Sequence, residues 1–324
     1  MIIVTGGAGF IGSVLVSELN KLGRKDIIIV DSLGEDEKWK NLVGLAYEDY
    51  FDKDEFLTLI KEERLPFEVE TIFHFGACSS TTEKDSNFLM YNNFKFSTEL
   101  VRYGFPRGAR FIYASSAATY GDGSLGYDDN EDKIEKLRPL NMYGYSKQLF
   151  DLWLKKENLL KKVAGLKFFN VYGPNEYHKM DMRSVVNKAF EQISECGKVK
   201  LFKSYKKEYS DGEQKRDFIY VKDAVQMALY FMDNHDINGL FNLGTGKART
   251  WNDLVNAVFA AMGKEPNIEY IEMPETLKSK YQYFTEADIS KLRKAGYDKE
   301  IYSLEEGVKD YVTNYLIPMK TIAW

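Results

Sequence analysis

Residues 5–12, "TGGAGFIG", decide how the rest of the chain is interpreted. They follow an apolar run and lead into a stretch with helical periodicity, the context in which this glycine spacing indicates a dinucleotide site. Gly6 permits a tight turn, Gly9 lets the backbone approach a pyrophosphate, and Gly12 lets the helix pack closely on the strand. The free N–H groups at the start of that helix would bind the phosphates.

Short β-branched runs alternate with helical patterns through the first half of the chain. Five runs are predicted as buried parallel strands, at 2–5, 27–30, 71–75, 110–115 and 163–169. Helices are predicted between them, at 11–22, 54–63, 87–103 and 143–160. This alternation predicts an α/β fold of the Rossmann type, a doubly wound parallel sheet with helices on both faces.

The pattern changes after residue 169. We expect a loop-rich region with one helix at 182–194, and then a strand and helix beginning with "DFIYV" that join the main sheet. A strand at 239–246 should end in a glycine turn whose role is structural, and "IEYI" should form another strand. These elements predict two discontinuous units: a dinucleotide-binding domain at 1–169 and 217–247, and a smaller α/β substrate-binding lobe at 170–216 and 248–324.

Composition narrows the function classes. The net charge of −5 argues against a general nucleic-acid surface. No apolar run reaches the ~18 residues of a membrane span, and residue 1 leads straight into a strand without a secretion signal, which predicts a cytoplasmic protein. The two cysteines, Cys78 and Cys196, have neither disulfide nor metal-site spacing, and three histidines are too few to suggest a metal centre.

The residues alone leave the choice of cofactor open. Asp31 ends the second predicted strand at about the ~20-residue offset of a ribose-binding acid, which favours the free 2′-hydroxyl of NAD. Lys38 and Lys53 follow in loops that could return to the adenosine end and bind the 2′-phosphate of NADP. Both lysines could equally be solvated surface residues.

Tyr143 and Lys147 begin a predicted helix, four positions apart and so on one face. A tyrosine with a pKa near ~10 needs a drop of about 3 units to act as a base at neutral pH. A neighbouring ammonium and a positively charged nicotinamide can supply that drop. Ser116, at the end of a strand, can hydrogen-bond the reacting oxygen. Lys179, in "NVYGPNEYHKMD", is either a solvated charge or a second proton-transfer group.

Six motifs in order, "TGGAGFIG", "YASSAATYG", "YGYSK", "FFNVYGP", "RDFIYV" and "FNLGTG", resemble the extended short-chain dehydrogenase/reductase superfamily of nucleotide-sugar enzymes. "FGACSSTTE" at 75–83, "YHKM" and the tail motif at 280–299 are similar to its branch of epimerases that invert carbon 6 of an ADP-linked heptose. The resemblance implies NADP as cofactor, ADP-heptose as substrate, a homo-oligomer such as a pentamer, and a product used for the inner core of lipopolysaccharide.

The resemblance also assigns site residues by position. Tyr143 and Lys179 correspond to the two catalytic acid/base groups, with Ser116 and Lys147 beside the tyrosine. Cofactor contacts are implied for Gly6, Gly9, Phe10, Ile11, Gly12, Asp31, Ser32, Lys38, Lys53, Phe75, Gly76, Ala77, Cys78, Ser79, Asn92, Lys147, Val171 and Lys179. Substrate contacts are implied for Ser79, Asn170, Asp181, Lys188, Phe202, Arg216 and Tyr281. Arg216 could instead pair with Asp217, and the loop at 203–214 could be a surface insertion or a substrate lid.

Lys179 distinguishes the competing functions. Inversion by a fixed nicotinamide requires the ketone to rotate, and one base cannot reach both oxygen positions within ~2.6–3.2 Å. A nucleotide-hexose 4-epimerase can work with one tyrosine and has no need of this lysine. A 4,6-dehydratase needs an acid pair after the hydroxyl, where this chain has Ala117 and Ala118. A catalytically silent NADP-sensing regulator would be free to lose the tyrosine, lysine or serine.

Overall fold

Seven parallel strands form the central sheet of the computed structural model, which describes residues 1–278 and 281–323. The order is β10-β6-β5-β4-β1-β2-β3, and every pairing is parallel. The strands are β1 (Ile2–Thr5), β2 (Ile27–Asp31), β3 (Asp49–Asp52), β4 (Thr71–His74), β5 (Arg110–Ser116), β6 (Ala164–Phe168) and β10 (Gly239–Leu243). The Rossmann-type prediction and its strands are confirmed. The acidic edge strand β3 was missed because its "DYFD" sequence has no buried apolar run.

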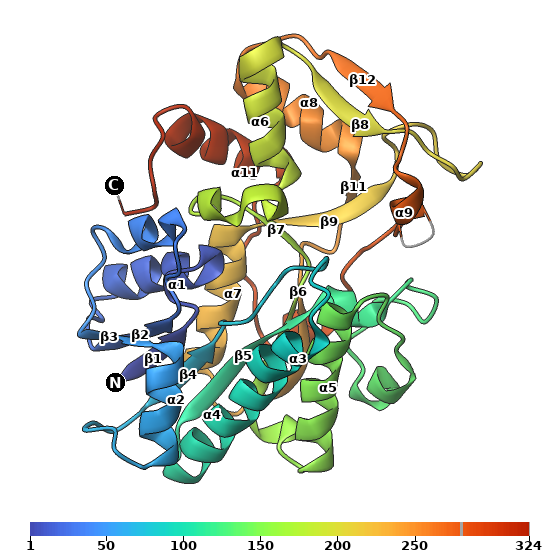
Figure 1. Ribbon diagram of the computed structural model, residues 1–324. Coiled ribbons are helices and arrows are strands. Elements are labelled where there is room, and N and C mark those ends of the chain that lie inside the picture. The colour runs from blue at the N-terminus through green and yellow to red at the C-terminus, as the bar shows by residue number, and fades with distance from the viewer. Residues whose placement is uncertain (279–280, 324) are drawn as a thin grey trace.

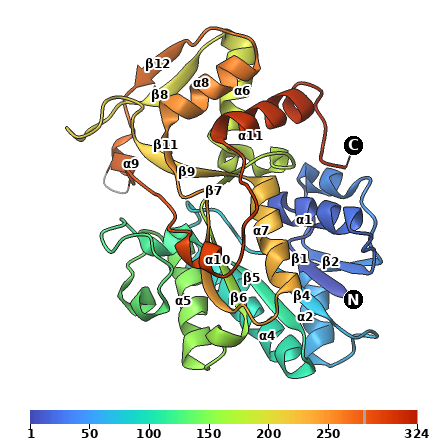
Figure 2. The ribbon, with the colours of Figure 1, turned by 180° about the vertical axis from the view of Figure 1, so that it is seen from behind.

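Helices cover both faces of this sheet (Figures 1 and 2). α1 (Phe10–Lys21) and α7 (Val221–Asp233) share one hydrophobic core with the sheet, and α2 (Lys53–Lys61), α4 (Phe96–Gly104) and α5 (Met142–Lys156) share the other. The predicted helix at 87–103 comprises α3 (Ser86–Leu89), a π-helical turn η2 (Met90–Lys95) and α4. Such turns often occur at functional sites.

The smaller lobe lies above the sheet in Figure 1. It contains the three-stranded sheet β11-β9-β7 and the pair β12-β8. Its strands are β7 (Asn170–Tyr172), β8 (Val199–Phe202), β9 (Lys215–Tyr220), β11 (Ala248–Thr250) and β12 (Ile268–Ile271). Its helices are α6 (Val185–Cys196), α8 (Trp251–Ala261) and α11 (Leu304–Tyr311), while the short α9 (Glu275–Lys278) and α10 (Ser290–Lys294) connect back to the larger lobe.

The prediction that "DFIYV" joins the main sheet is wrong. This segment is β9, which pairs with β7 and β11 in the smaller lobe, and only the helix that follows it, α7, packs on the main sheet. Sequence could not separate the two outcomes, because a buried apolar strand looks the same in either sheet. The boundaries predicted for the two domains stay a prediction.

Two further properties concern the described residues. None of their helices combines the length and apolar character needed to cross a membrane. Within the same residues, no group of three or more His, Cys, Asp or Glu side chains is arranged to hold a metal ion.

Candidate active site

Four cavities meet where the carboxyl edge of the main sheet faces the smaller lobe. The glycine-loop cavity, about 400 Å³, is lined by the loop before α1, the segment after β4, and the side chains of Tyr143 and Lys179. The junction cavity is shared by Ser116, Tyr143, Lys179 and Asn170. The outer cavity adds Arg216 and Tyr281, and the strand-end cavity is lined by Asp31, Ser32, Lys53 and Asn92.

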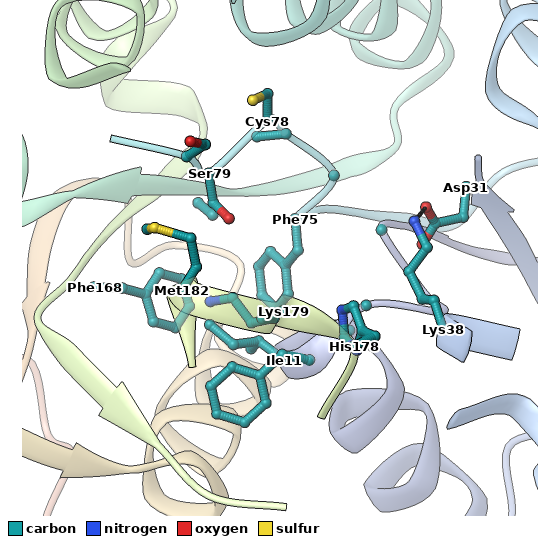
Figure 3. A pocket seen from close by; sticks show the side chains of 18 of the residues that line it. Ile11, Asp31, Lys38, Phe75, Cys78, Ser79, Phe168, His178, Lys179 and Met182 are labelled. Carbon is teal, nitrogen blue, oxygen red and sulfur yellow. Dashed lines mark hydrogen bonds and ion pairs between the residues drawn. The ribbon is translucent and has the colours of Figure 1, made fainter. Parts of the chain in front are cut away.

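Most residues predicted for the site come together here. The glycine-loop cavity contains Gly6, Gly9, Phe10, Ile11, Gly12, Asp31, Lys38, Phe75, Gly76, Ala77, Cys78, Ser79, Tyr143, Lys147 and Lys179. Val171 lines the junction cavity. Figure 3 shows Lys179 among Phe75, Ile11 and Phe168, with Asp31 and Lys38 together at the other end.

The glycine loop is shaped for close approach. Gly6 has a φ of +70°, and a Cβ there would lie 2.7 Å from the backbone of Gly76. A Cβ on Gly12 would lie 2.0 Å from the Gly6 carbonyl oxygen, so only glycine fits where the loop folds onto α1. Gly9 is the N-cap of α1 and provides no side-chain hydrogen bond to the first turn. A helix start with free N–H groups facing a cavity fits a dinucleotide pyrophosphate.

The acid at the end of β2 is held by three donors. Asp31 accepts hydrogen bonds from the Ala8 N–H at 2.9 Å, from the Ser32 N–H at 2.8 Å and from Lys38 Nζ at 3.0 Å. Lys53 Nζ donates to Asn92 Oδ1 at 2.6 Å, across the strand-end cavity. Both lysines are mostly buried, so the alternative that they are solvated surface residues is wrong.

Tyr143 lies in the first turn of α5, where Asn141 caps the helix by accepting from the Gly144 N–H at 2.8 Å. Burial raises the pKa of Tyr143 above its ordinary value, and the hydrogen bond with Ser116 opposes that rise. Burial lowers the pKa of Lys147 to about 8. Its Nζ donates to the Ala114 carbonyl at 2.8 Å. The protein alone therefore does not lower the pKa of Tyr143; the prediction assigned that drop to the ammonium and a positively charged nicotinamide together.

Lys179 comes from η7 (Tyr177–Met182) and lines the junction cavity together with Tyr143 of α5. Its Nζ lies 5.4 Å from the centroid of the Phe10 ring. Burial lowers the pKa of Lys179, and the charge of Glu176 opposes that fall. The solvated-charge alternative is wrong for this residue, because its side chain lines both the glycine-loop and the junction cavities.

Buried amides, which sequence reasoning missed, hold the loop that carries Lys179. Asn175, with a φ of +73°, donates from Nδ2 to Ser13 Oγ at 2.9 Å, and its Oδ1 accepts from the Ile322 N–H at 2.9 Å. Asn41 Nδ2 donates to the Asn175 carbonyl at 3.1 Å and lies 3.3 Å from His178 Nδ1. Only the proximity of Asn175 to "HK" could have drawn attention to it, and Asn41 carried no such signal, because the partners of both amides are distant in sequence.

Three predicted substrate residues do not reach the cavities described above. Met180 adopts a φ of +48° and a ψ of −121°, a kink after which Asp181 is exposed. Lys188 Nζ donates to the Asp181 carbonyl at 2.6 Å. Phe202 pairs with Ile271 in the β12-β8 sheet.

Arg216 lies at the base of the outer cavity. Its guanidinium stacks over Trp251 at 5.7 Å and over Tyr281 at 5.3 Å, and it donates to the carbonyls of Lys215 and Gln282. Burial lowers its pKa. Within the described part of the chain, Arg216 forms no ion pair with a carboxylate. A buried cation without a carboxylate partner favours the binding of an anionic ligand.

The alternative pair with Asp217 does not form. Asp217 instead accepts hydrogen bonds from the N–H groups of Thr245, Gly246 and Ala287, at 2.7–3.0 Å. This acid fixes the turn after β10, so the structural role predicted for "FNLGTG" is confirmed. The 203–214 loop packs Lys206 over Tyr283 at 4.7 Å, and Lys203 pairs with Glu272.

Fold and site together define a nucleotide-dependent enzyme of the epimerase and dehydratase type. A model of the NAD dependent epimerase/dehydratase family matches residues 2–244, and the chain belongs to this family.

The relatives of this chain belong to a narrower group of enzymes within the family. The chain is 58% identical over 316 residues to ADP-L-glycero-D-manno-heptose-6-epimerase of Nitratidesulfovibrio vulgaris, covering 98% of each chain. It is 52% identical to the enzyme of the same name from Fusobacterium nucleatum, again with 98% of each covered. Among solved structures, the Helicobacter pylori ADP-L-glycero-D-manno-heptose-6-epimerase matches with a TM-score of 0.81 and 30% identity, over 97% of this chain and 95% of that one. The resemblance noted from sequence is confirmed.

Proposed function

We propose that the protein is an isomerase that inverts carbon 6 of ADP-D-glycero-D-manno-heptose to give ADP-L-glycero-D-manno-heptose. It oxidises carbon 6 transiently to a ketone and reduces it again with tightly bound NADP, using two bases. The observation that carries this proposal is the position of Tyr143 and Lys179. They come from α5 and η7, which are far apart in sequence, and line the same two cavities beside the glycine loop.

Bound NADP would supply the hydride acceptor for carbon 6 in its oxidised form and the hydride donor in its reduced form. Tyr143 takes the proton of the carbon 6 hydroxyl during oxidation or returns a proton during reduction. The hydroxyl of Ser116 forms a hydrogen bond with the same oxygen. After the ketone rotates, its oxygen lies away from Tyr143, and Lys179, which lines the same cavities, exchanges the second proton. The apolar rings of Phe75 and Phe168 line the same space and limit the access of water.

The two mostly buried lysines around Asp31 support NADP. Lys38 offsets the negative charge of Asp31, which would otherwise repel a 2′-phosphate. Replacing Lys38 with Met should raise the Kd for NADP⁺ by about tenfold, the effect of losing one charged hydrogen bond, and change the Kd for NAD⁺ much less. Titration calorimetry with both dinucleotides measures this difference.

Lys40→Met is the matched control, because Lys40 lies in the same short helix and pairs with Glu37 at 2.6 Å. It should bind both dinucleotides as the wild type does. Equal weakening of NADP⁺ and NAD⁺ binding by Lys38→Met would contradict the NADP assignment.

The stacked Arg216 supports a diphosphate ligand. Arg216→Met should raise KM for the ADP-sugar by about 10- to 100-fold, because it removes a charged hydrogen bond to phosphate. Its neighbour across the strand pair, Arg249, has the carboxylates of Asp253 and Glu305 as partners, so Arg249→Met is the control. Steady-state kinetics should show a KM effect for the first variant alone. A normal KM in Arg216→Met would remove the phosphate role.

The function is tested by substrate. Incubation with ADP-D-glycero-D-manno-heptose should give the L-glycero product by NMR, while UDP-glucose and UDP-N-acetylglucosamine remain unchanged. Inversion at carbon 4 of a UDP-sugar would favour the nucleotide-hexose 4-epimerase. Binding of NADP without turnover of any nucleotide sugar would favour the silent regulator. We also expect a homo-oligomer, which sedimentation can measure.

A further inference from the structure

Glu176 is a buried acid that no step above uses. It has 1% of its surface exposed and lies three residues before Lys179. Its two carboxylate oxygens accept hydrogen bonds from the N–H and the hydroxyl of Ser184, both at 2.6 Å. Ser184 is the N-cap of α6, a helix of 12 residues, so the carboxylate lies at the positive end of the helix dipole.

Glu176 also holds both ends of the loop that carries Lys179. The N–H of Lys179 donates to the Glu176 carbonyl at 3.0 Å, and the carboxylate holds Ser184 beyond the kink at Met180. The segment between Glu176 and Ser184 is therefore tied at both ends, with the lysine between them. The Nζ of Lys179 lies over the Phe10 ring and faces the cavity.

We propose that Glu176 is a positioning residue for Lys179, which fixes the loop that carries the lysine and keeps its ammonium form available for proton transfer. This proposal rests on the two-base function above and deepens it. Glu176 does not line the cavities described here, so it acts through the lysine rather than on the sugar.

Electrostatics in the surrounding elements agrees with this role. Burial raises the pKa of Glu176, and the bonds from Ser184 and the charge of Lys179 oppose that rise. Burial lowers the pKa of Lys179, and Glu176 opposes that fall. The other titratable groups nearby are Tyr177 and Tyr311 around the acid, and His178 beside the lysine, with Lys38 and Asp36 beyond it. The pKa of His178 is lowered to about 4, so this ring is neutral near pH 7.

Glu176→Gln keeps the shape but removes the negative charge, so the pKa of Lys179 should fall further. Whether the lysine acts as acid or as base, the limb of the pH–rate profile that it controls should move to lower pH, and KM for the sugar should stay unchanged. Competitive labelling with acetic anhydride at a series of pH values, read by mass spectrometry of the Lys179 peptide, measures its titration without any substrate.

Two controls sharpen this experiment. Lys147 in the same samples should titrate unchanged, because Asp151, and not Glu176, is the carboxylate that acts on it. Glu191→Gln removes a carboxylate of α6 that is paired with Arg183, and the titration of Lys179 should stay as in the wild type.

A folded Glu176→Gln protein whose Lys179 titrates as in the wild type would overturn the proposal. If that variant does not fold, Glu176→Asp decides, because it keeps the charge but is too short to hold Ser184. It should lower kcat without moving the Lys179 titration, and an unchanged kcat would overturn the proposal. Failure of the proposed function would appear separately, as absence of epimerisation in the wild type, whatever the labelling shows.

Discussion

Tyr143→Phe should lower kcat for epimerisation by about 10³-fold, within the range that general acid–base catalysis contributes. The variant loses only the hydroxyl that meets Ser116, so NADP binding and the melting temperature should stay close to wild type. The effect is large because the variant has no hydroxyl at this position to exchange the proton of the carbon 6 oxygen. Turnover is measured by NMR of the heptose product.

Tyr145→Phe is its matched control. Tyr145 lies two positions further along α5 and is 44% exposed. The same change at that position should leave kcat within about twofold of wild type, as surface substitutions usually do. Tyr143→Phe with near-normal turnover would show that another group removes the proton.

Lys179→Met should lower epimerisation by about 10²- to 10³-fold, because one of the two proton transfers loses its group. It should still dismutate an aldehyde analogue of the substrate, since in that assay hydride leaves and returns on one face, beside Tyr143. Comparing the two rates in one preparation separates loss of the second base from loss of the whole site.

Lys200→Met, at an exposed position of β8, controls for the loss of a positive charge in the smaller lobe and should have no effect. Lys179→Met with near wild-type epimerisation would end the two-base account, even if the variant bound NADP normally.

The features that sequence predicted best are those that depend only on residues close together in the chain. β1, β2 and β5 are continuous apolar runs, and Tyr143 and Lys147 share a face through helix spacing alone. β7 and β8 were missed because three or four residues between loops carry too little pattern.

The position of Lys179 in the site, by contrast, does not follow from the residues next to it in the sequence. Lys179 reaches the cavity because Asn175 and Asn41 tie its loop to α1 and to the C-terminal segment, contacts between residues more than a hundred positions apart. The same dependence on tertiary contacts left Glu176 unnoticed. The kink at Met180, after which Asp181 is exposed, is likewise not visible in the sequence, and the substrate contacts predicted for Asp181 and Lys188 stay a prediction.

One measurement tests the central claim directly: turnover in ordinary water of ADP-D-glycero-D-manno-heptose carrying deuterium at carbon 6. Transient oxidation with return of the same hydride predicts an L-glycero product that keeps its deuterium at carbon 6. A product inverted at carbon 6 but carrying hydrogen from water there, or no inversion at carbon 6, would contradict it.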